Sequence, residues 1–423
     1  MRLNKVTQSN GLRVVTVPMA DNPSVTVLVM VEAGSKYEDK STSGLSHFLE
    51  HMVFKGTPTR PKAVDISREL DGIGAQYNAF TTQEFTGYYA KADARHLDRI
   101  IDIVSDMYLH PLFEESEIAK EKGVIVEEIR MYQDLPQRHV HDVLMDLVYG
   151  DQPVGWNIAG TIDNVRSFKR DQFIVYRDAH YVSKKTVVIV SGSFKENEIM
   201  RKIEKSFSSI SKDKASGKVA VKESQTVPQV KVEYKETDQT HLVLGMRTFD
   251  VTDPRTPAML VLSTVLGRGM SSRLFSKLRD EMGICYYVRT EQNAFTDHGL
   301  LTISVGLDNS RVEEGVKVIL AECSRMKHEP VSPAELKKAK DYIAGTTMLE
   351  LETSEARAEY CGLEEILKKA IELPDDLIKK VSAVTAAEVQ KLAGRIFVDA
   401  GLNMAVIGKF NGEEGFKRYL KFD

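Results

Sequence analysis

The chain of 423 residues repeats itself at a nearly constant distance, and this repeat limits the folds that are open to it. The tetrapeptide Asn-Ala-Phe-Thr occurs at Asn78–Thr81 and again at Asn293–Thr296, which is 215 residues later. Near the end of each half, an apolar run leads into Gly-x-Phe, at Gly192–Phe194 and at Gly408–Phe410, with an offset of 216. Two separate matches at nearly one offset predict two domains that arose by duplication.

A segment rich in Lys and Ser separates the two halves, over about residues 211–229. It has no sustained apolar period, which is typical of a linker, although a long surface loop inside a single domain would look the same. The repeat favours a linker. We therefore predict an N-terminal domain over residues 1–212, a linker over 213–228 and a C-terminal domain over 229–423.

Each half mixes strand patterns with helix patterns. Short apolar runs rich in β-branched and aromatic residues predict strands at Val25–Val31, Phe85–Ala90 and Leu242–Gly245. Start signals and apolar residues recurring every three or four positions predict helices at Leu45–Val53, Asp93–Leu109 and Glu115–Met131. The predicted fold class is α+β, with two homologous domains that are each a largely antiparallel sheet covered by helices.

The composition argues against several classes of protein. With 57 Lys+Arg against 61 Asp+Glu, the net charge is −4, which disfavours general binding to nucleic acid. No apolar run approaches the roughly 18 residues of a membrane span, and the N-terminus lacks the apolar segment of a signal peptide. The three cysteines are too few and too scattered for a disulfide framework. We therefore expect a cytoplasmic protein.

The pentapeptide from His47 to His51 carries the strongest chemical signal. On a helix, His47 and His51 lie one turn apart on one face, so both imidazoles can bind the same metal ion. Zinc suits such ligands, and catalytic zinc sites combine three protein ligands with a water. Glu50 projects near that face, where its carboxylate would take a proton from the water. The order His-x-x-Glu-His is that of the inverted zinc proteases; the alternative is two histidines of an ordinary helix.

The third ligand is expected on the helix predicted at Glu115–Met131. Its Glu121 and Glu128 are seven residues apart and share one face. A carboxylate among apolar neighbours is uncommon unless it is paired or ligated. We therefore predict Glu128 as the ligand and Glu121 as the acceptor of a hydrogen bond from a ligating imidazole. Periodicity alone does not exclude Glu127 as the ligand. It also does not exclude that this is an ordinary Glu-rich helix face exposed to solvent.

This set of residues resembles the pitrilysin, insulin-degrading enzyme and mitochondrial processing peptidase family of inverted zinc metallopeptidases. That family carries its glutamate ligand 76 to 77 residues after the second histidine, and Glu128 lies 77 residues after His51. The family pattern around this position favours Glu128 over Glu127. The segments Gly44–Thr57 and Ala75–Ala90 also follow the family closely.

In the second half, the resemblance falls on Arg279 and Tyr286, which match a paired arginine and tyrosine of the family. Cys285 departs from the pattern, because relatives usually have a small residue before the tyrosine. The second half lacks His-x-x-Glu-His, so the resemblance implies one Zn²⁺ per chain. It further implies that Tyr286 donates to the oxyanion of the reaction and that Arg279 binds backbone carbonyls of the substrate.

The segment from residue 78 to residue 90 is the predicted substrate strand. Alternation at Phe85, Gly87 and Tyr89 is typical of an edge strand, and an exposed edge captures an extended peptide through main-chain hydrogen bonds. The alternative is an ordinary strand with a covered edge. The residues predicted to bind substrate are Asn78, Ala79 and Phe80, together with Arg279 and Tyr286.

The resemblance implies a zinc metalloendopeptidase that cleaves unfolded peptides, targeting peptides or propeptides inside a closed chamber. As a short, two-domain member, the chain is expected to form a homodimer. Two alternatives remain: a subunit without catalysis, and an active subunit that requires an inactive homologous partner in a heterodimer.

Overall fold

The computed structural model describes residues 1–214 and 216–422, and its contacts divide the chain into two compact units. The first unit comprises Met1–Arg130, Trp156–Val219 and Leu349–Ile371. The second unit comprises Met131–Gly155, Ala220–Met348 and the chain from Glu372 onward. Each unit has its own sheet and its own hydrophobic core.

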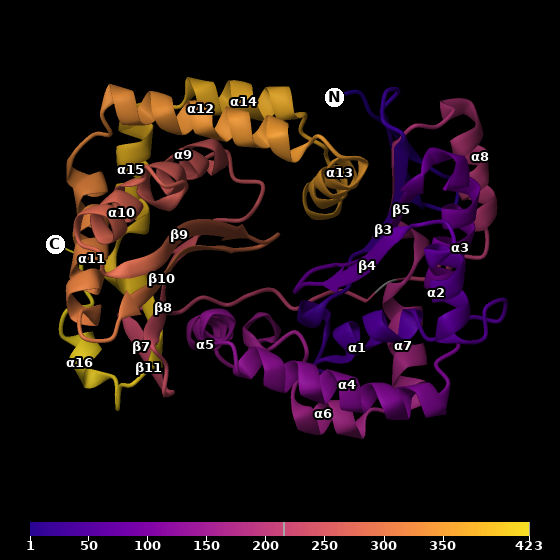
Figure 1. Cartoon of the computed structure of the whole chain (residues 1–423), viewed down its shortest axis with the longest axis horizontal. Coiled ribbons are helices and arrows are strands. Elements are labelled where there is room, and N and C mark those ends of the chain that lie inside the picture. Colours follow the sequence, from indigo (N-terminus) through magenta and orange to yellow (C-terminus); the bar gives the residue numbers. More distant parts are fainter. Residues whose placement is uncertain (215, 423) are drawn as a thin grey trace. The chain divides into compact units, whose positions relative to one another are not determined.

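The sheet of the first unit has, within the described residues, six strands in the order β1-β2-β6-β3-β5-β4. Figure 1 labels β3, β4 and β5 among them. Strands β2 and β6 run parallel, and the other neighbouring pairs are antiparallel. The strands are β1 (Asn4–Thr7), β2 (Arg13–Pro18), β3 (Ser24–Val31), β4 (Gln76–Thr81), β5 (Thr86–Asp93) and β6 (Thr186–Gly192).

The sheet of the second unit has the order β7-β11-β8-β10-β9 among the residues that are described. Here β7 and β11 run parallel and the other neighbouring pairs are antiparallel, as in the first unit without β1. The strands are β7 (Gln229–Tyr234), β8 (Gln239–Thr248), β9 (Cys285–Ala294), β10 (Gly299–Asp308) and β11 (Leu402–Gly408). Two mixed, largely antiparallel sheets with one topology confirm the predicted α+β fold of homologous domains.

Helices cover both sheets. Those that belong wholly or mainly to the first unit are α1 (Leu45–Val53), α2 (Ala63–Asp71), α3 (Leu97–Leu109), α4 (Glu115–Gln133), α6 (Ile162–Ser167), α7 (Arg170–His180), α8 (Glu196–Ser206) and α13 (Ser354–Lys368). Those of the second unit are α5 (Pro136–Tyr149), α9 (Thr256–Gly267), α10 (Arg273–Phe275), α11 (Val312–His328), α12 (Pro333–Glu350), α14 (Pro374–Ala383), α15 (Ala386–Ile396) and α16 (Glu414–Lys417).

Strand β3 shows why both faces of the first sheet are covered. Its Val27 and Val29 point into the main core, whereas Leu28 and Met30 point into a second cluster on the opposite face. A strand buried on both sides is expected to be apolar at successive positions, and β3 is. Helix α13 lies on that second face, where Gly362 allows close approach: a Cβ there would lie 2.4 Å from the Met30 sulfur.

Helices α5 and α13 each pack on the sheet formed by the other half of the sequence. Helix α13, far along the sequence, lies on β3 and β6 of the first unit. Helix α5, from the first half, lies on β8 and β11 of the second unit, with Leu144 against Gly245. The compact units are therefore discontinuous in sequence, because one helix that covers each sheet comes from the other half of the chain.

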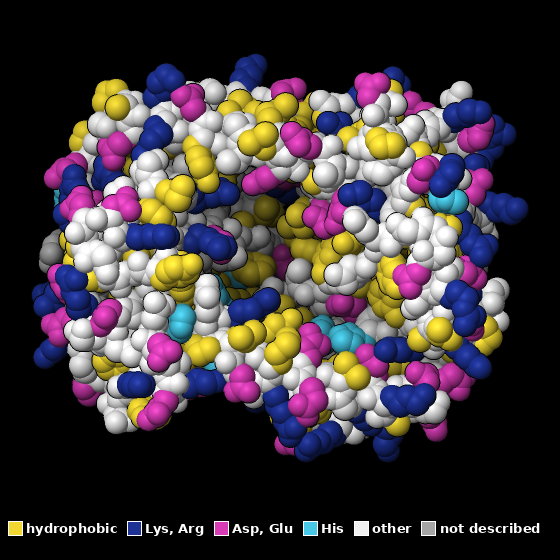
Figure 2. Space-filling model, in the orientation of Figure 1, with side chains coloured by type: hydrophobic (Ala, Val, Ile, Leu, Met, Phe, Trp, Pro, Cys, Tyr) yellow, Lys and Arg dark blue, Asp and Glu magenta, His cyan; other side chains and the backbone are white. Residues whose placement is uncertain are grey.

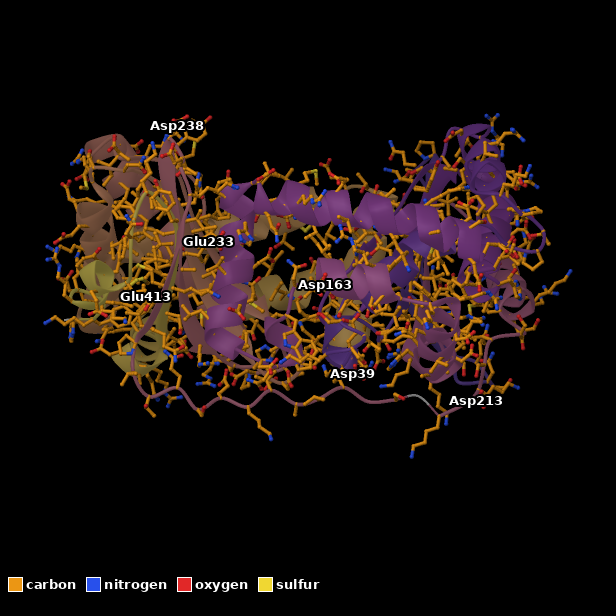
Figure 3. All side chains as sticks on the ribbon, turned by 90° about the horizontal axis from the view of Figure 1, so that it is seen from below. Asp39, Asp163, Asp213, Glu233, Asp238 and Glu413 are labelled. Carbon is orange, nitrogen blue, oxygen red and sulfur yellow. The ribbon has the colours of Figure 1, made fainter. Side chains whose placement is uncertain are left out.

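The segment predicted as a linker has no helix or strand among its described residues (Figure 3). Its residues up to Val219 belong to the first unit and those from Ala220 to the second. No helix in the described part of the chain is both long and apolar enough to cross a membrane.

The predicted edge strand needs a correction. The predicted strand Phe85–Ala90 lies in β5 from Thr86 onward, and β5 pairs with β3 on one side and with β4 on the other, so the edge is β4. The alternating pattern has another cause. Tyr88 and Ala90 face the main core, whereas Tyr89 packs against the cluster around α13 on the opposite face.

Candidate metal centre

Helix α1 presents the predicted zinc motif on its polar face. Leu45, Phe48, Leu49 and Met52 recur at helical spacing and are buried in the main core. This arrangement leaves His47, Glu50 and His51 on the opposite face of the helix. The helix spans Leu45–Val53, as the sequence predicts.

The N-terminus of α1 is held by a buried carboxylate that sequence reasoning missed. Glu38 accepts hydrogen bonds from the backbone N–H groups of Gly44 (2.8 Å) and Ser46 (2.6 Å). Burial raises the pKa of the Glu38 carboxyl to about 8, although these hydrogen bonds favour its charged form. Gly44 has φ +97°, and a Cβ there would lie 2.6 Å from the Ala159 carbonyl oxygen, so this turn requires glycine.

The structure brings His47, His51 and Glu128 together. Glu128 Oε2 lies 3.7 Å from His47 Nε2 and 3.4 Å from His51 Nε2. Among the described residues, these three form the one group of His, Cys, Asp or Glu whose ligand atoms all lie within 4.8 Å of one another. Figure 2 shows histidine side chains with acidic side chains beside them at the place of α1 in Figure 1.

Glu121 and Lys55 support the histidine nearest to them. The Nδ1–H of His51 donates to Glu121 Oε1 at 2.8 Å, and this hydrogen bond orients Nε2 toward Glu128. Lys55 Nζ binds the other oxygen of Glu121 at 2.6 Å. Lys55 was not predicted, because it lies in the turn after α1, where helical spacing no longer indicates which side chains meet.

Glu127, the rival ligand, points elsewhere. Its side chain is 70% exposed and accepts a hydrogen bond from Arg130 Nη1 at 2.6 Å. Glu128 is only 22% exposed in its side chain and belongs to the histidine cluster.

The protonation of the two histidines fits a site for a cation. Burial and the neighbouring His51 lower the pKa of His47 below its usual value, which favours the neutral ring. Burial would also lower the pKa of His51, but Glu121 and Glu128 outweigh it and raise that pKa to about 9. A bound cation would take the place of this proton. Two imidazole nitrogens and one carboxylate oxygen are a donor set that zinc enzymes use, so these residues fit zinc.

Glu50 lies beside this cluster and is held by a residue of strand β4. Thr81 Oγ1 donates to Glu50 Oε2 at 2.5 Å. Burial raises the pKa of Glu50, and the hydrogen bond from Thr81 opposes that shift. Sequence reasoning missed Thr81 because its closeness to Glu50 depends on how the sheet and α1 pack.

The predicted substrate residues lie on the free edge strand. Asn78, Ala79 and Phe80 belong to β4, which has β5 as its one neighbour among the strands that the structure describes. The Asn78 side chain accepts the Ala79 N–H at 2.9 Å. Strand β4 ends at Thr81, the residue that binds Glu50, so one end of this edge lies at the candidate site.

Arg279 and Tyr286 lie together in the second unit. Arg279 Nη1 donates to the Tyr286 carbonyl oxygen at 3.1 Å, and its guanidinium lies 5.5 Å from the Tyr286 ring centre. The Tyr286 side chain is displayed at the surface, with the residue 70% exposed. The preceding Cys285 is buried, which raises the pKa of its thiol to about 11 and makes it a poor nucleophile. The roles of Arg279 and Tyr286 in a reaction stay predictions.

Two family models match the chain. The one described as "Insulinase (Peptidase family M16)" covers residues 13–162, which include the histidines, Glu50 and Glu128. The one described as "Peptidase M16 inactive domain" covers residues 167–343. In the described part of the second unit, no group of ligands like that of the first occurs.

Curated relatives and solved structures agree with this assignment. The uncharacterized zinc protease YmxG of Bacillus subtilis is 35% identical over 94% of this chain and 96% of its own length. An uncharacterized zinc protease of Streptomyces coelicolor is 32% identical over 97% of this chain and 91% of its own. In fold, the chain matches a crystallised protease from Helicobacter pylori with a TM-score of 0.91 and 24% identity, over 96% of this chain and 99% of that one. The chain thus belongs, as its motifs predict, to the insulinase family of zinc proteases, peptidase family M16.

Proposed function

We propose that this chain is a zinc-dependent endopeptidase that binds one zinc ion and cleaves extended peptides. The observation that carries the proposal is the convergence of His47 Nε2, His51 Nε2 and Glu128 Oε2 beside Glu50. His47, His51 and Glu128 would hold the ion. When bound, zinc supplies Lewis acidity and lowers the pKa of its water to about 7.

Glu50 serves as the general base and then as the general acid. Its carboxylate accepts a proton from the attacking water while the water oxygen bonds to the carbonyl carbon of the scissile peptide. The same proton passes to the leaving amine nitrogen as the C–N bond breaks. Thr81 holds one carboxylate oxygen of Glu50 and so limits the directions from which the proton is taken.

The second unit supplies the groups that meet the substrate carbonyls. The Tyr286 hydroxyl donates to the oxyanion that develops as water adds, and Arg279 donates to substrate backbone carbonyls. The exposure of Tyr286 supports this role, because a reacting hydroxyl must reach substrate. In the structure, Arg279 binds the backbone at Tyr286 and so fixes the strand that carries the ring.

The substrate binds in extended form along β4. Asn78, Ala79 and Phe80 offer main-chain groups of an edge strand, which recognise peptide backbone rather than particular side chains. An edge strand makes no demand on a free terminus of the peptide, which favours an endopeptidase. Unfolded peptides, targeting peptides and propeptides satisfy this requirement, whereas a folded protein offers no free strand and does not enter a closed chamber.

The first experiment compares the parent chain with Glu50→Gln on a mixture of unstructured peptides and on a compact globular protein, with zinc present. The parent should cut the peptides and spare the folded protein, and Glu50→Gln should cut neither, because an amide cannot act as a base. Zinc content should be one per chain in both. Cleavage by both chains alike would disprove the role of Glu50. An inactive parent that binds zinc would favour a subunit that requires a partner.

The assembly is tested separately. We propose a homodimer, which sedimentation should detect at about twice the chain mass of 47.5 kDa. A monomer that gains activity only with a homologous inactive chain would replace the homodimer by a heterodimer.

A further inference from the structure

We propose that the short segment Gly34–Glu38 positions the general base, and that its buried Lys36–Glu84 ion pair locks it in place. This inference rests on the proposed function and assigns these residues a positioning role, since none of them belongs to the ligand set. It follows from how the two partners of the Thr81–Glu50 hydrogen bond are each held.

The first partner, Thr81, is the last residue of β4 and opens a tight loop, Thr82–Phe85. Thr82 N–H donates to the Phe85 carbonyl at 2.9 Å. The Thr82 hydroxyl accepts the N–H groups of Glu84 (3.2 Å) and Phe85 (3.1 Å). The loop is therefore stiff by itself, and its position in the unit sets the position of the Thr81 hydroxyl.

The loop is fixed from outside by Gly34–Glu38. Ser35 N–H donates to the Thr82 carbonyl at 3.2 Å, and Lys36 N–H donates to the Gln83 carbonyl at 2.8 Å. The backbones approach so closely that a Cβ on Gly34 would lie 2.3 Å from the Thr82 carbonyl oxygen. Any larger residue at position 34 must push the loop away.

The second partner, Glu50, is fixed by the other end of the same segment. Glu38 accepts the N–H groups of Gly44 and Ser46 and so holds the first turn of α1, the helix that carries Glu50. Asp39, labelled in Figure 3, follows directly and is exposed, so the buried part of the segment ends at Glu38. Both partners of the hydrogen bond are thus anchored to five consecutive residues.

The charges within this arrangement are buried to an unusual degree. Lys36 Nζ lies 2.9 Å from Glu84 Oε1, and the two residues are 1% and 4% exposed. Lys218, from the segment predicted as the linker, also pairs with Glu84. Burial would raise the pKa of Glu84, but the two lysines outweigh it and hold that pKa below its usual range.

A buried ion pair is weak evidence for stability, because desolvation offsets much of the attraction, and an apolar pair of similar size often serves as well. What an ion pair provides over an apolar contact is direction: Glu84 is held at one distance and angle from Lys36. Catalysis is sensitive to such placement, since an error of about 1 Å at the reacting groups costs up to roughly a hundredfold in rate. We therefore assign the pair to alignment of Thr81 and Glu50.

The test uses the full chain with Lys36→Met, which keeps the length of the side chain and removes its charge. We expect kcat to fall by about tenfold or more, with KM and zinc content unchanged. Lys36→Arg should restore most of kcat. Lys218 also pairs with Glu84 but lies closer to the surface, so Lys218→Ala should lower kcat by only about two- to threefold. This variant replaces Lys36→Met in the test if Lys36→Met does not fold.

The matched control is Glu365→Gln, which breaks another buried pair of the first unit, between Glu365 and Arg13 on α13 and β2. This variant should lose thermal stability and keep kcat. If Lys36→Met lowers only the melting temperature, as the control does, or lowers kcat only in proportion to lost zinc, the positioning role is disproved.

Hydrogen exchange supplies a readout that does not depend on activity. In Lys36→Met, amides of Thr82–Phe85 and of the first turn of α1 should exchange faster by about tenfold or more, while those of α13 stay unchanged. Unchanged exchange at the loop overturns the inference whatever the activity. If the parent chain cuts no peptide, the proposed function fails, and the exchange alone decides whether this segment holds Thr81 against Glu50.

Discussion

Helix α1 of the first unit and helix α9 of the second occupy matching places in the repeat but present opposite chemistry. Both pack near the edge strand of their sheet, β4 or β9. Adding the repeat offset of 215 to His47, Glu50 and His51 leads to Leu262, Val265 and Leu266, all of which are buried in the core of the second unit.

The third ligand follows the same rule. The offset pairs Glu128 on α4 with Ile343 on α12, which is 4% exposed and belongs to the same apolar cluster as Leu262. At the positions that the repeat offset pairs with the predicted ligands and with Glu50, the second unit therefore has buried hydrocarbon side chains. A shared strand topology thus does not by itself require a metal site.

The largest effect is expected when one of the predicted zinc ligands is removed from the first unit. In Glu128→Gln, zinc should fall from one per chain to about one tenth or less, because a neutral amide is a far weaker ligand than a carboxylate, and peptidase activity should fall with it. Glu127→Gln is the matched control, since its side chain is exposed, and should keep both. Metal analysis after dialysis measures the difference, and equal loss in both variants would refute the ligand assignment.

Leu262→Ala tests whether the matching position in the second unit is part of a packed apolar core. A cavity in a packed core should lower the free energy of unfolding by about 2–5 kcal/mol. Zinc content should not change, because Leu262 lies in the unit without ligands. Thermal or urea denaturation measures the loss, and a stability change below about 1 kcal/mol would show that the position is not packed as the structure has it.

Acid should weaken the first unit through His180, which is 4% exposed and lies between the rings of Tyr37 and Tyr176. Burial and the nearby Lys185 lower the pKa of His180 to about 4. The unfolded chain, with a pKa near 6.5, therefore binds this proton first as the pH falls. The contribution of the neutral His180 to the free energy of unfolding is fully present above about pH 6.5. It decreases as the pH falls, and the loss reaches about 3 kcal/mol at pH 4.

His180→Phe keeps a ring at this place and removes the proton. Between pH 6.5 and 4, the melting temperature of this variant should fall less than that of the parent. Equal slopes in the two chains would contradict the assignment of acid sensitivity to His180.

The smallest effect is expected from Glu121→Gln, which leaves all three ligands in place. The amide no longer offers His51 a charged acceptor, so zinc affinity should fall by about 10- to 100-fold while the fold and the stoichiometry at saturating zinc persist. Competition with a chelator measures the affinity. A loss as complete as that of Glu128→Gln would show that Glu121 binds the metal directly.

Local spacing made part of the site predictable. The helix at Leu45–Val53, with two histidines and Glu50 at helical intervals, forms with the predicted bounds, because residues one turn apart meet whatever surrounds the helix. Helix α4 also begins at the predicted Glu115. Its seven-residue spacing identified Glu121 and Glu128 as neighbours on one face, but periodicity alone did not separate Glu128 from Glu127.

Other parts depended on contacts between distant residues. Strand β5 looked like an edge because its residues alternate, yet alternation reports only that the two faces differ, whereas being an edge depends on which strands pair. The exchange of α5 and α13 between units, and the support of Glu50 by Thr81, Glu38 and Lys36, have no local signature for the same reason.

The duplication, the mixed fold and the helix with His47, Glu50 and His51 could be predicted from the sequence, since repeats and helical periods are properties of neighbours along the chain. Which glutamate lies beside the histidines, which strand forms the edge and which residues hold Glu50 followed only from the folded structure. Those outcomes depend on packing between residues that are distant in sequence, such as Thr81 and Glu50, 31 residues apart, or Lys218 and Glu84, 134 residues apart, and no local pattern encodes these contacts.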